Sequence, residues 1–213
     1  MTPTLLGLLV EAALRTVAIS AASIVIGFVI GLGVSAARLS PSRWLTFPAR
    51  AFVSFFRGVP LLVQLLLIYN LLPVIGVNVP SVVAAIIGLS LCTAAYQAEN
   101  LRGGFASVPR GLLEAADMAG LSPSQQLARI RAPIAFRLTL PSLVNEAIMI
   151  LKASSLASVV GVIELTREAQ DLNSGLYIPL QLFAVAGLLY FVINRALAYG
   201  GLLAERKFTW GRT

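Results

Sequence analysis

The residues best placed to do chemistry are polar side chains that interrupt the apolar segment 134–157. If this segment is helical, at about 100° per residue, four of them fall within an arc of about 120°. These four residues, the polar stripe, are Ser142, Asn145, Glu146 and Lys152. Charges at bilayer depth cost at least a few kcal/mol and rarely face lipid. We therefore expect the polar stripe to face the interior of a helix bundle.

Two interpretations of the polar stripe remain open. In the first, it contacts the charged group of a solute near the membrane midplane. In the second, Glu146 pairs with Lys152 or with another subunit, and the stripe serves packing alone. Gln64 in segment 53–72 lies at similar depth and is a weaker candidate. The candidate substrate path comprises Gln64, Asn145, Glu146, Lys152 and Ser155.

The sequence offers little for catalysis. It contains no histidine, so the commonest general base and metal ligand is missing, and we expect no metal site. Ser155 and Lys152, three residues apart, form the only plausible nucleophile–base pair, and we attribute that spacing to chance. The second lysine, Lys207, does not follow a glycine, nor does Lys152, so the chain has no Gly-x-x-x-x-Gly-Lys-Ser/Thr phosphate loop. We expect no enzyme activity and no cofactor bound by this chain.

The composition indicates that lipid is the solvent of most of the chain. Hydrophobic residues make up 58% of it and charged residues only 12%, where a soluble domain carries roughly a quarter. Five apolar segments are near the roughly 20 residues that a helix needs to cross hydrocarbon. They run approximately over 14–37, 53–72, 80–100, 134–157 and 178–200. The sequence predicts an all-α membrane protein of five transmembrane helices in a single domain, with Gly27 and Gly31 spaced for close contact with another helix.

The cations predict the orientation of these helices. Lysines and arginines gather on one side of a five-span model, as cytoplasmic residues do. This set is Arg38, Arg43, Arg50, Arg102, Arg110, Arg129, Arg131, Arg137, Arg206, Lys207 and Arg212. The N-terminus is then outside and the C-terminus cytoplasmic. Membrane topology explains the net charge of +7 better than nucleic-acid binding does, because the cations lie in the breaks between apolar runs.

The longest break, residues 103–133, is expected to fold into two short helices on the cytoplasmic side. A helix over 112–119 is predicted to end at Gly120, which suits the C-terminal cap. Ser122 then starts a second helix, with Pro123 in its first turn and Gln125 three residues after the cap. Leu112, Leu113, Ala116 and Leu121 are the apolar side chains that this knob would offer.

Two further groups of polar residues have positions in this topology. Glu99 and Arg102 lie three apart near the cytoplasmic end of the third span, and we expect a structural ion pair that Arg57 joins. The outer segment 159–177 is polar, and its acidic residues would suit basic residues on an external partner. The alternative for this segment is a solvated loop without a partner.

Several blocks of the sequence resemble permeases of ATP-binding-cassette importers, specifically the polar amino acid uptake family. Residues Glu114-Ala115-Ala116, followed by Gly120, Ile130 and Pro133, look like the EAA loop of these permeases. Three further blocks are similar to the family and occur in its order. They are Arg57-Gly58-Val59-Pro60-Leu61-Leu62-Val63-Gln64, Ala95-Tyr96-Gln97-Ala98-Glu99-Asn100-Leu101-Arg102-Gly103-Gly104, and Lys152-Ala153-Ser154-Ser155-Leu156 with Gly161-Val162-Ile163-Glu164-Leu165-Thr166. The sequence departs from the family pattern at Leu112, Ala132 and Ala153.

The resemblance implies a mechanism and a set of partners. Two permease subunits, identical or related, would form the pore in a bacterial cytoplasmic (inner) membrane. A cytoplasmic ATPase dimer carrying ATP and Mg²⁺ would power it, and an external solute-binding protein would deliver a polar amino acid. The resemblance assigns ATPase coupling to Glu114, Ala115, Ala116, Gly120, Leu121 and Pro123.

Two other classes of function were weighed. A stand-alone secondary transporter or channel would use Glu146 and Lys152 as an ion relay, but such carriers commonly show an internal repeat, and five spans give none. A membrane-embedded enzyme would depend on the Ser155–Lys152 pair. The importer permease is the interpretation that the sequence favours.

Overall fold

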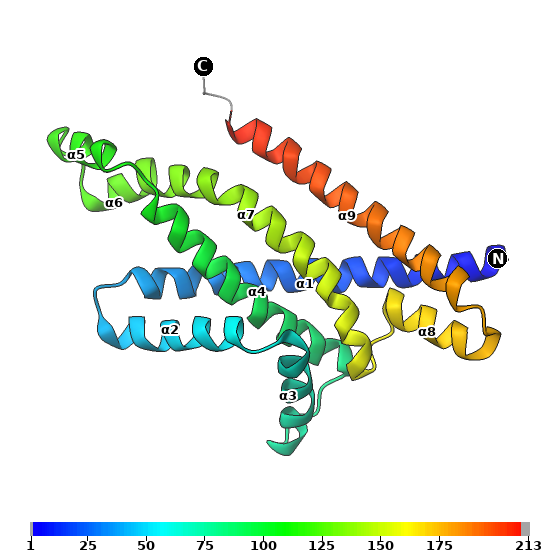
Figure 1. The fold of residues 1–213 in the computed structure, drawn as a ribbon. Coiled ribbons are helices and arrows are strands. Elements are labelled where there is room, and N and C mark those ends of the chain that lie inside the picture. The colour runs from blue at the N-terminus through cyan, green and yellow to red at the C-terminus, as the bar shows by residue number, and fades with distance from the viewer. Residues whose placement is uncertain (1, 210–213) are drawn as a thin grey trace.

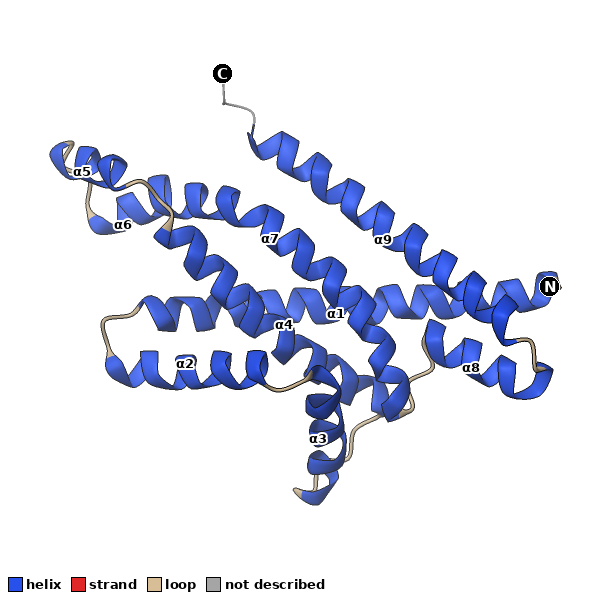
Figure 2. Cartoon of the chain, in the orientation of Figure 1, coloured by secondary structure: helices blue, strands red, loops and turns tan. Residues whose placement is uncertain are grey.

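The computed structural model of the protein describes residues 2–209, and every regular element within them is a helix (Figures 1 and 2). The elements, in chain order, are α1 (Pro3–Leu39), α2 (Arg43–Gly58), α3 (Leu61–Val74), α4 (Ser81–Ala106), α5 (Arg110–Met118), α6 (Pro123–Gln126), the π-helix η1 (Leu127–Arg131), α7 (Ala132–Ala153), the 3₁₀-helix η2 (Ser154–Val160), α8 (Leu165–Leu176) and α9 (Pro179–Thr209). The all-helical class is as predicted. Arg212, one of the predicted cytoplasmic cations, lies outside the described residues.

Four helices within residues 2–209 are long and apolar enough to cross a membrane, and a fifth span results if the bent pair α2–α3 counts as one. The five predicted spans correspond to this upper number. The four are α1, α4, the continuous helix from α6 through η2, and α9. α1 begins at Pro3 rather than near residue 14, because Glu11 and Arg15 pair at 2.6 Å one helical turn apart and need not end the helix.

The second predicted span, 53–72, is divided between α2 and α3 and is not one straight helix. The chain bends by 111° between α2 and α3, at Val59 and Pro60. Proline has no backbone N–H and disfavours a helical conformation in the residue before it. Val59 is accordingly extended, with φ −93° and ψ 135°.

α1 and α4 cross in the middle of the molecule, where small residues allow them to pack closely (Figure 1). A Cβ on Gly27 would meet Thr93, and one on Gly31 would lie 3.0 Å from the carbonyl oxygen of Ala94. The predicted contact of these two glycines with another helix is confirmed. Gly104 plays the same part between α4 and α7, because a Cβ there would lie 2.7 Å from the Ala135 carbonyl oxygen.

A small apolar cluster around Val53 and Ala95 joins α2 to α4, and two larger clusters hold other helices together. One joins α1, α3, α4 and η2 around Leu65 and Leu89. The other joins α1, α8 and α9 around Leu9, Leu165 and Leu182. The α5–α6 hairpin lies at one end of the molecule, whereas α8 and the N-terminus lie at the other (Figure 1). The fold therefore separates the two polar segments, 103–133 and 159–177, by the length of the spans.

Candidate functional site

The first candidate site is the helical hairpin formed by α5, the turn after it and α6 (residues 110–126). Gly120 has φ +73°, in the left-handed region that glycine adopts without strain. The N–H of Leu121 donates to the Ala116 carbonyl at 3.0 Å, and the N–H of Gly120 donates to the Asp117 carbonyl at 3.0 Å. This is the Schellman pattern, which satisfies the last carbonyls of a helix. The predicted helix end at Gly120 is confirmed.

The start of α6 is also confirmed. The Gln125 N–H donates to the Ser122 hydroxyl at 3.4 Å, while the Ser122 N–H donates to the Gln125 side chain at 2.9 Å, which is a complete capping box. Gln126 then ties the two helices together, because its side-chain amide donates to the Asp117 carboxylate at 2.6 Å and to the Leu121 carbonyl at 3.0 Å. Hydrogen bonds within the hairpin therefore hold α5 and α6 in a fixed relative position.

The hairpin presents exposed apolar side chains. Met118, which was not among the predicted surface residues, is 91% exposed, and Leu112 is 45% exposed. Ala116, expected among the offered apolar residues, is only 3% exposed. The other predicted coupling residues vary in exposure: Glu114, Ala115, Gly120 and Pro123 are exposed, and Leu121 is half-buried. Exposed apolar groups on a polar segment are typical of a surface that binds a partner protein.

The polar stripe on α7 has one buried member and three that face away from the chain's own core. Glu146 is buried, and its carboxyl interacts with the hydroxyl of Thr93 on α4. Ser142, Asn145 and Lys152 are exposed. Within the described residues Glu146 and Lys152 form no ion pair, so the structure does not contain the intrachain pair that was one of the two interpretations of the stripe.

Lys152 and Ser155 instead line a cavity of about 230 Å³ with Thr166 and Tyr190. Its walls come from the end of α7, from η2, from α8 and from α9. The Ser155 hydroxyl donates to the Lys152 carbonyl at 2.9 Å, as helix hydroxyls commonly do, and is not paired with the amine. The two residues are therefore neighbours in a polar cavity and do not form a nucleophile–base pair.

Gln64 stabilises the bend between α2 and α3. Its side-chain amide donates to the carbonyl of Phe56 at 2.9 Å and to that of Val59 at 2.7 Å. These are carbonyls that the broken helix leaves without a helical donor. The Oε1 atom of Gln64 is buried and has no hydrogen-bond partner among the described residues. The amide group of Gln64 is thus occupied by the fold, and only its oxygen remains for another group.

Glu99 joins three helices through arginines. Its carboxylate pairs with Arg38 of α1 and with Arg102 of its own helix, whose Nε lies 3.0 Å away. Nη1 of Arg57 at the end of α2 lies 3.9 Å from it, and this guanidinium also lies over the ring of Tyr96 at 5.2 Å. Arg38 was not predicted to join this network, because only the crossing of α1 and α4 brings it to Glu99.

A second carboxylate network lies at the opposite end, around Glu164. This residue is fully buried and caps α8, accepting from the N–H of Thr166 at 2.9 Å and of Arg167 at 2.7 Å. The hydroxyl of Tyr190 on α9 donates to it at 2.7 Å. Burial raises the pKa of Glu164, and these hydrogen bonds oppose that effect. Glu164 is therefore not available to an external partner, contrary to what the acidic character of segment 159–177 suggested.

Comparison with known proteins decides the class of this molecule. The family described as "binding-protein-dependent transport system inner membrane component" matches residues 23–199. The chain belongs to this family. Such a permease is the non-catalytic membrane subunit of an ATP-binding-cassette importer, whose ATPase is a separate chain, and a stand-alone transporter is not favoured.

Individual relatives cover nearly the whole permease. The probable amino-acid ABC transporter permease protein YckA of Bacillus subtilis (strain 168) is 39% identical over 91% of this chain and 85% of its own length. The nopaline transport system permease protein NocM of Agrobacterium fabrum (strain C58 / ATCC 33970) is 38% identical over 92% of this chain and 86% of its own length. A crystal structure of an amino acid ABC transporter with histidines contains a chain that is 32% identical, with a TM-score of 0.89 over 94% of both chains. The resemblance identified from the sequence motifs is confirmed.

Proposed function

We propose that this permease forms part of the translocation path for a polar amino acid, and that a separate ATPase drives it by docking on the hairpin 110–126. The observation that carries the proposal is the hairpin itself: it is braced by hydrogen bonds, presents Met118 and Leu112 outward and carries the Glu114-Ala115-Ala116 pattern. An ATPase that moves the hairpin would move a rigid body. Relatives named for amino-acid transport support the substrate class.

The exposure of the polar stripe supports the presence of a second permease subunit beside α7. Three polar side chains of the stripe, Lys152 among them, are exposed on a helix that is long and apolar enough to cross a membrane. Facing lipid would cost several kcal/mol, so this side of α7 fits a water-filled path between two subunits. In that path, Lys152 would suit the carboxylate of an amino acid, and Glu146, which is buried behind the exposed side of α7, would favour the ammonium through its charge. Gln64 would contribute at most its free oxygen.

The arrangement of the two polar ends supports an orientation. The hairpin and the many arginines near it would be cytoplasmic, which fits the bias of cytoplasmic loops toward cations. The opposite end, with the N-terminus and α8, would then face an external solute-binding protein. On α8 the exposed pair Arg167–Asp171, at 3.0 Å, is available for such a contact. The membrane would be the cytoplasmic membrane of a bacterium.

The test of the proposal is uptake into proteoliposomes that contain the permease with or without its partners. Labelled arginine, histidine, glutamate and glutamine are presented with the binding protein outside and ATP inside. We expect accumulation of at least one of them only when both the ATPase and the binding protein are present. Accumulation by the permease alone would contradict the proposal.

A single substitution tests the role of the polar stripe. Glu146→Gln removes a negative charge without changing shape, and we expect the relative uptake of arginine and glutamate to change because the stripe would meet the charged groups of the solute. Glu11→Gln, the same change on the outward face of α1, is the matched control. If both variants keep the wild-type ratio, Glu146 serves packing alone.

A further inference from the structure

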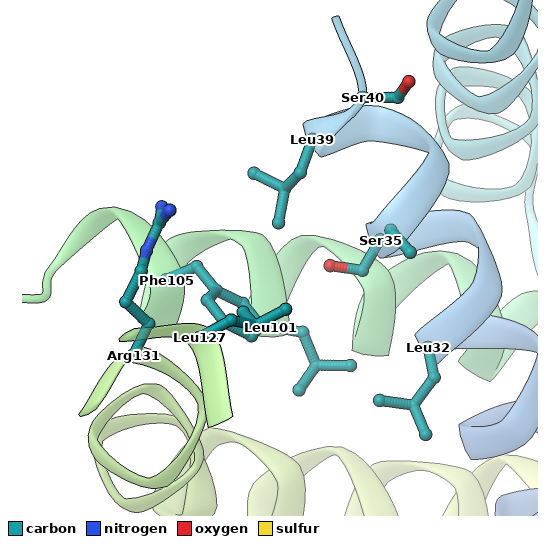
Figure 3. A pocket seen from close by; sticks show the side chains of 9 residues that line it. Leu32, Ser35, Leu39, Ser40, Leu101, Phe105, Leu127 and Arg131 are labelled. Carbon is teal, nitrogen blue, oxygen red and sulfur yellow. The ribbon is translucent and has the colours of Figure 1, made fainter. Parts of the chain in front are cut away.

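One unassigned feature of the permease is a cavity of about 390 Å³ at the end of the bundle from which the hairpin emerges. Its walls are the last turns of α1, the end of α4 and the π-helix η1. Most of its lining is apolar, including Leu32, Leu39, Leu101 and Phe105 (Figure 3). All three walls belong to helices that are candidate membrane spans, so the cavity lies where lipid can reach it.

Two polar groups of the cavity lack partners. The Ser35 hydroxyl is buried, points into the cavity in Figure 3, and has no hydrogen-bond partner among the described residues. In the same helix the hydroxyls of Thr16 and Ser23 bond the carbonyl one turn earlier at 3.0 and 2.8 Å, whereas the Ser20 hydroxyl, like that of Ser35, has no partner among the described residues. The buried Nε of Arg131 likewise has no partner among the described residues. Leaving such groups unpaired costs about 1–3 kcal/mol each, which indicates that something absent from the isolated chain satisfies them.

The chemistry of the lining selects the occupant. Arg131 is the only charged side chain among the lining residues, so an anionic group fits this part of the cavity. Ser35 lies more than one helical turn before the C-terminal end of α1, and its hydroxyl can donate to a carbonyl. The remaining surface is aliphatic and aromatic. A ligand with a negative head, an ester carbonyl below it and a hydrocarbon chain matches this order.

We propose that the cavity binds one anionic phospholipid, with the phosphate on Arg131, an ester carbonyl on Ser35 and an acyl chain along Leu32 and Leu101. Basic cavities between transmembrane helices on the cytoplasmic side are a known type of anionic lipid site. The cationic residues near this end of the bundle disfavour the ammonium group of a zwitterionic lipid. The proposal rests on the proposed function only in taking this end as cytoplasmic and in its coupling readout.

The site has a consequence for coupling, because η1 forms one wall. A π-helical turn is a local departure from the α-helix that often marks a functional position. η1 connects the hairpin to α7 without a break, so a lipid wedged against it resists displacement of the hairpin root. We expect ATP hydrolysis stimulated by the binding protein to depend on anionic lipid.

The test is native mass spectrometry of the complete transporter, purified from membranes and exchanged into mixed phosphatidylglycerol and phosphatidylcholine. Arg131→Gln should weaken retention of phosphatidylglycerol about fivefold or more, given the contribution of one arginine to anionic lipid binding. Arg129→Gln removes the same charge from the exposed side of η1 and should retain the lipid. Equal retention by these two variants, or equal retention of phosphatidylcholine by the wild type, would overturn the proposal.

Two further variants keep the test decisive if Arg131→Gln fails to assemble. Arg131→Lys preserves the charge and should keep phosphatidylglycerol, whereas Ser35→Ala should release it more readily. The opposite order would refute the site. Lipid retention needs neither ATP nor substrate, so it remains measurable even if the transport proposal fails.

Discussion

The conformation of Gly120 makes the strongest prediction about coupling. With φ at +73°, any side chain that replaces the hydrogen must hold a left-handed backbone, which costs an L-residue about 1–2 kcal/mol. Nothing lies within 4 Å of a Cβ built there, so the cost is backbone strain and not a clash. A strain of this size changes the population of the hairpin conformation about 5- to 30-fold relative to an unravelled turn.

The prediction is a graded series at this one position. Gly120→Asn should be mildest, because asparagine tolerates the left-handed region, followed by Gly120→Ala and then Gly120→Val, whose branched side chain is least tolerant. The unravelled turn gives up the hydrogen bonds from Leu121 to Ala116 and from Gly120 to Asp117. The outward placement of Met118 depends on those bonds, and we expect ATPase docking to weaken in the same order.

The assay is ATP hydrolysis stimulated by loaded binding protein in proteoliposomes, together with the affinity of the ATPase for the permease. Gly111→Ala is the matched control, since Gly111 lies within α5, has open space around a Cβ and should gain slightly in helix stability. Membrane insertion should be normal in every variant. If Gly120→Val hydrolyses ATP and binds the ATPase like the wild type, the hairpin is not the coupling element.

The two carboxylate networks give two further predictions. Glu99→Gln removes the charge that pairs with Arg38, whose side chain is only 15% exposed, and should destabilise the permease by about 1.5–3 kcal/mol, measured as a lower thermal midpoint in detergent. Arg102→Gln changes a more exposed partner of Glu99 and should lower the midpoint less. An equal effect of the two variants would contradict the burial argument. Tyr190→Phe removes the hydroxyl that donates to Glu164 and should cost about 1–3 kcal/mol, whereas Tyr177→Phe, on an 83% exposed ring, should leave the midpoint unchanged.

Local signals in the sequence were sufficient for the hairpin. Its ends depend on contacts within a few residues: a glycine for the left-handed position and a serine–proline–serine–glutamine run for the capping box. Such signals are read from neighbours along the chain, so they predict structure well. Burial inside the hairpin depends on how α5 and α6 meet, which is why Ala116 was wrongly expected at the surface and Met118 was overlooked.

The networks and the bend required tertiary information. Arg38 and Glu99 are 61 residues apart, and nothing in the sequence indicates that the crossing of α1 and α4 joins them. The bend at Pro60 had a local signal in Gly58-Val59-Pro60, but the apolar run continued across it and masked the break. Periodicity correctly put Glu146 on a polar face of α7, yet it could not distinguish a residue buried against α4 from one facing another subunit.

The position of α7 explains how a docking event on the hairpin would reach the polar stripe. α6, η1 and α7 follow one another without a loop, so a displacement of the hairpin acts directly on the helix that carries Glu146. At the far end η2 adopts 3₁₀ geometry before Gly161, which has φ +82°, so the chain there is no longer a straight α-helical rod. α1 is held near its C-terminal end by Glu99 through Arg38, and in its N-terminal half by the Leu165 N–H, which donates to the Thr16 hydroxyl at 3.0 Å. Because α7 has irregular turns at both ends while α1 is tied to α4 and to the start of α8, we expect a displacement of the hairpin to tilt α7 more than α1.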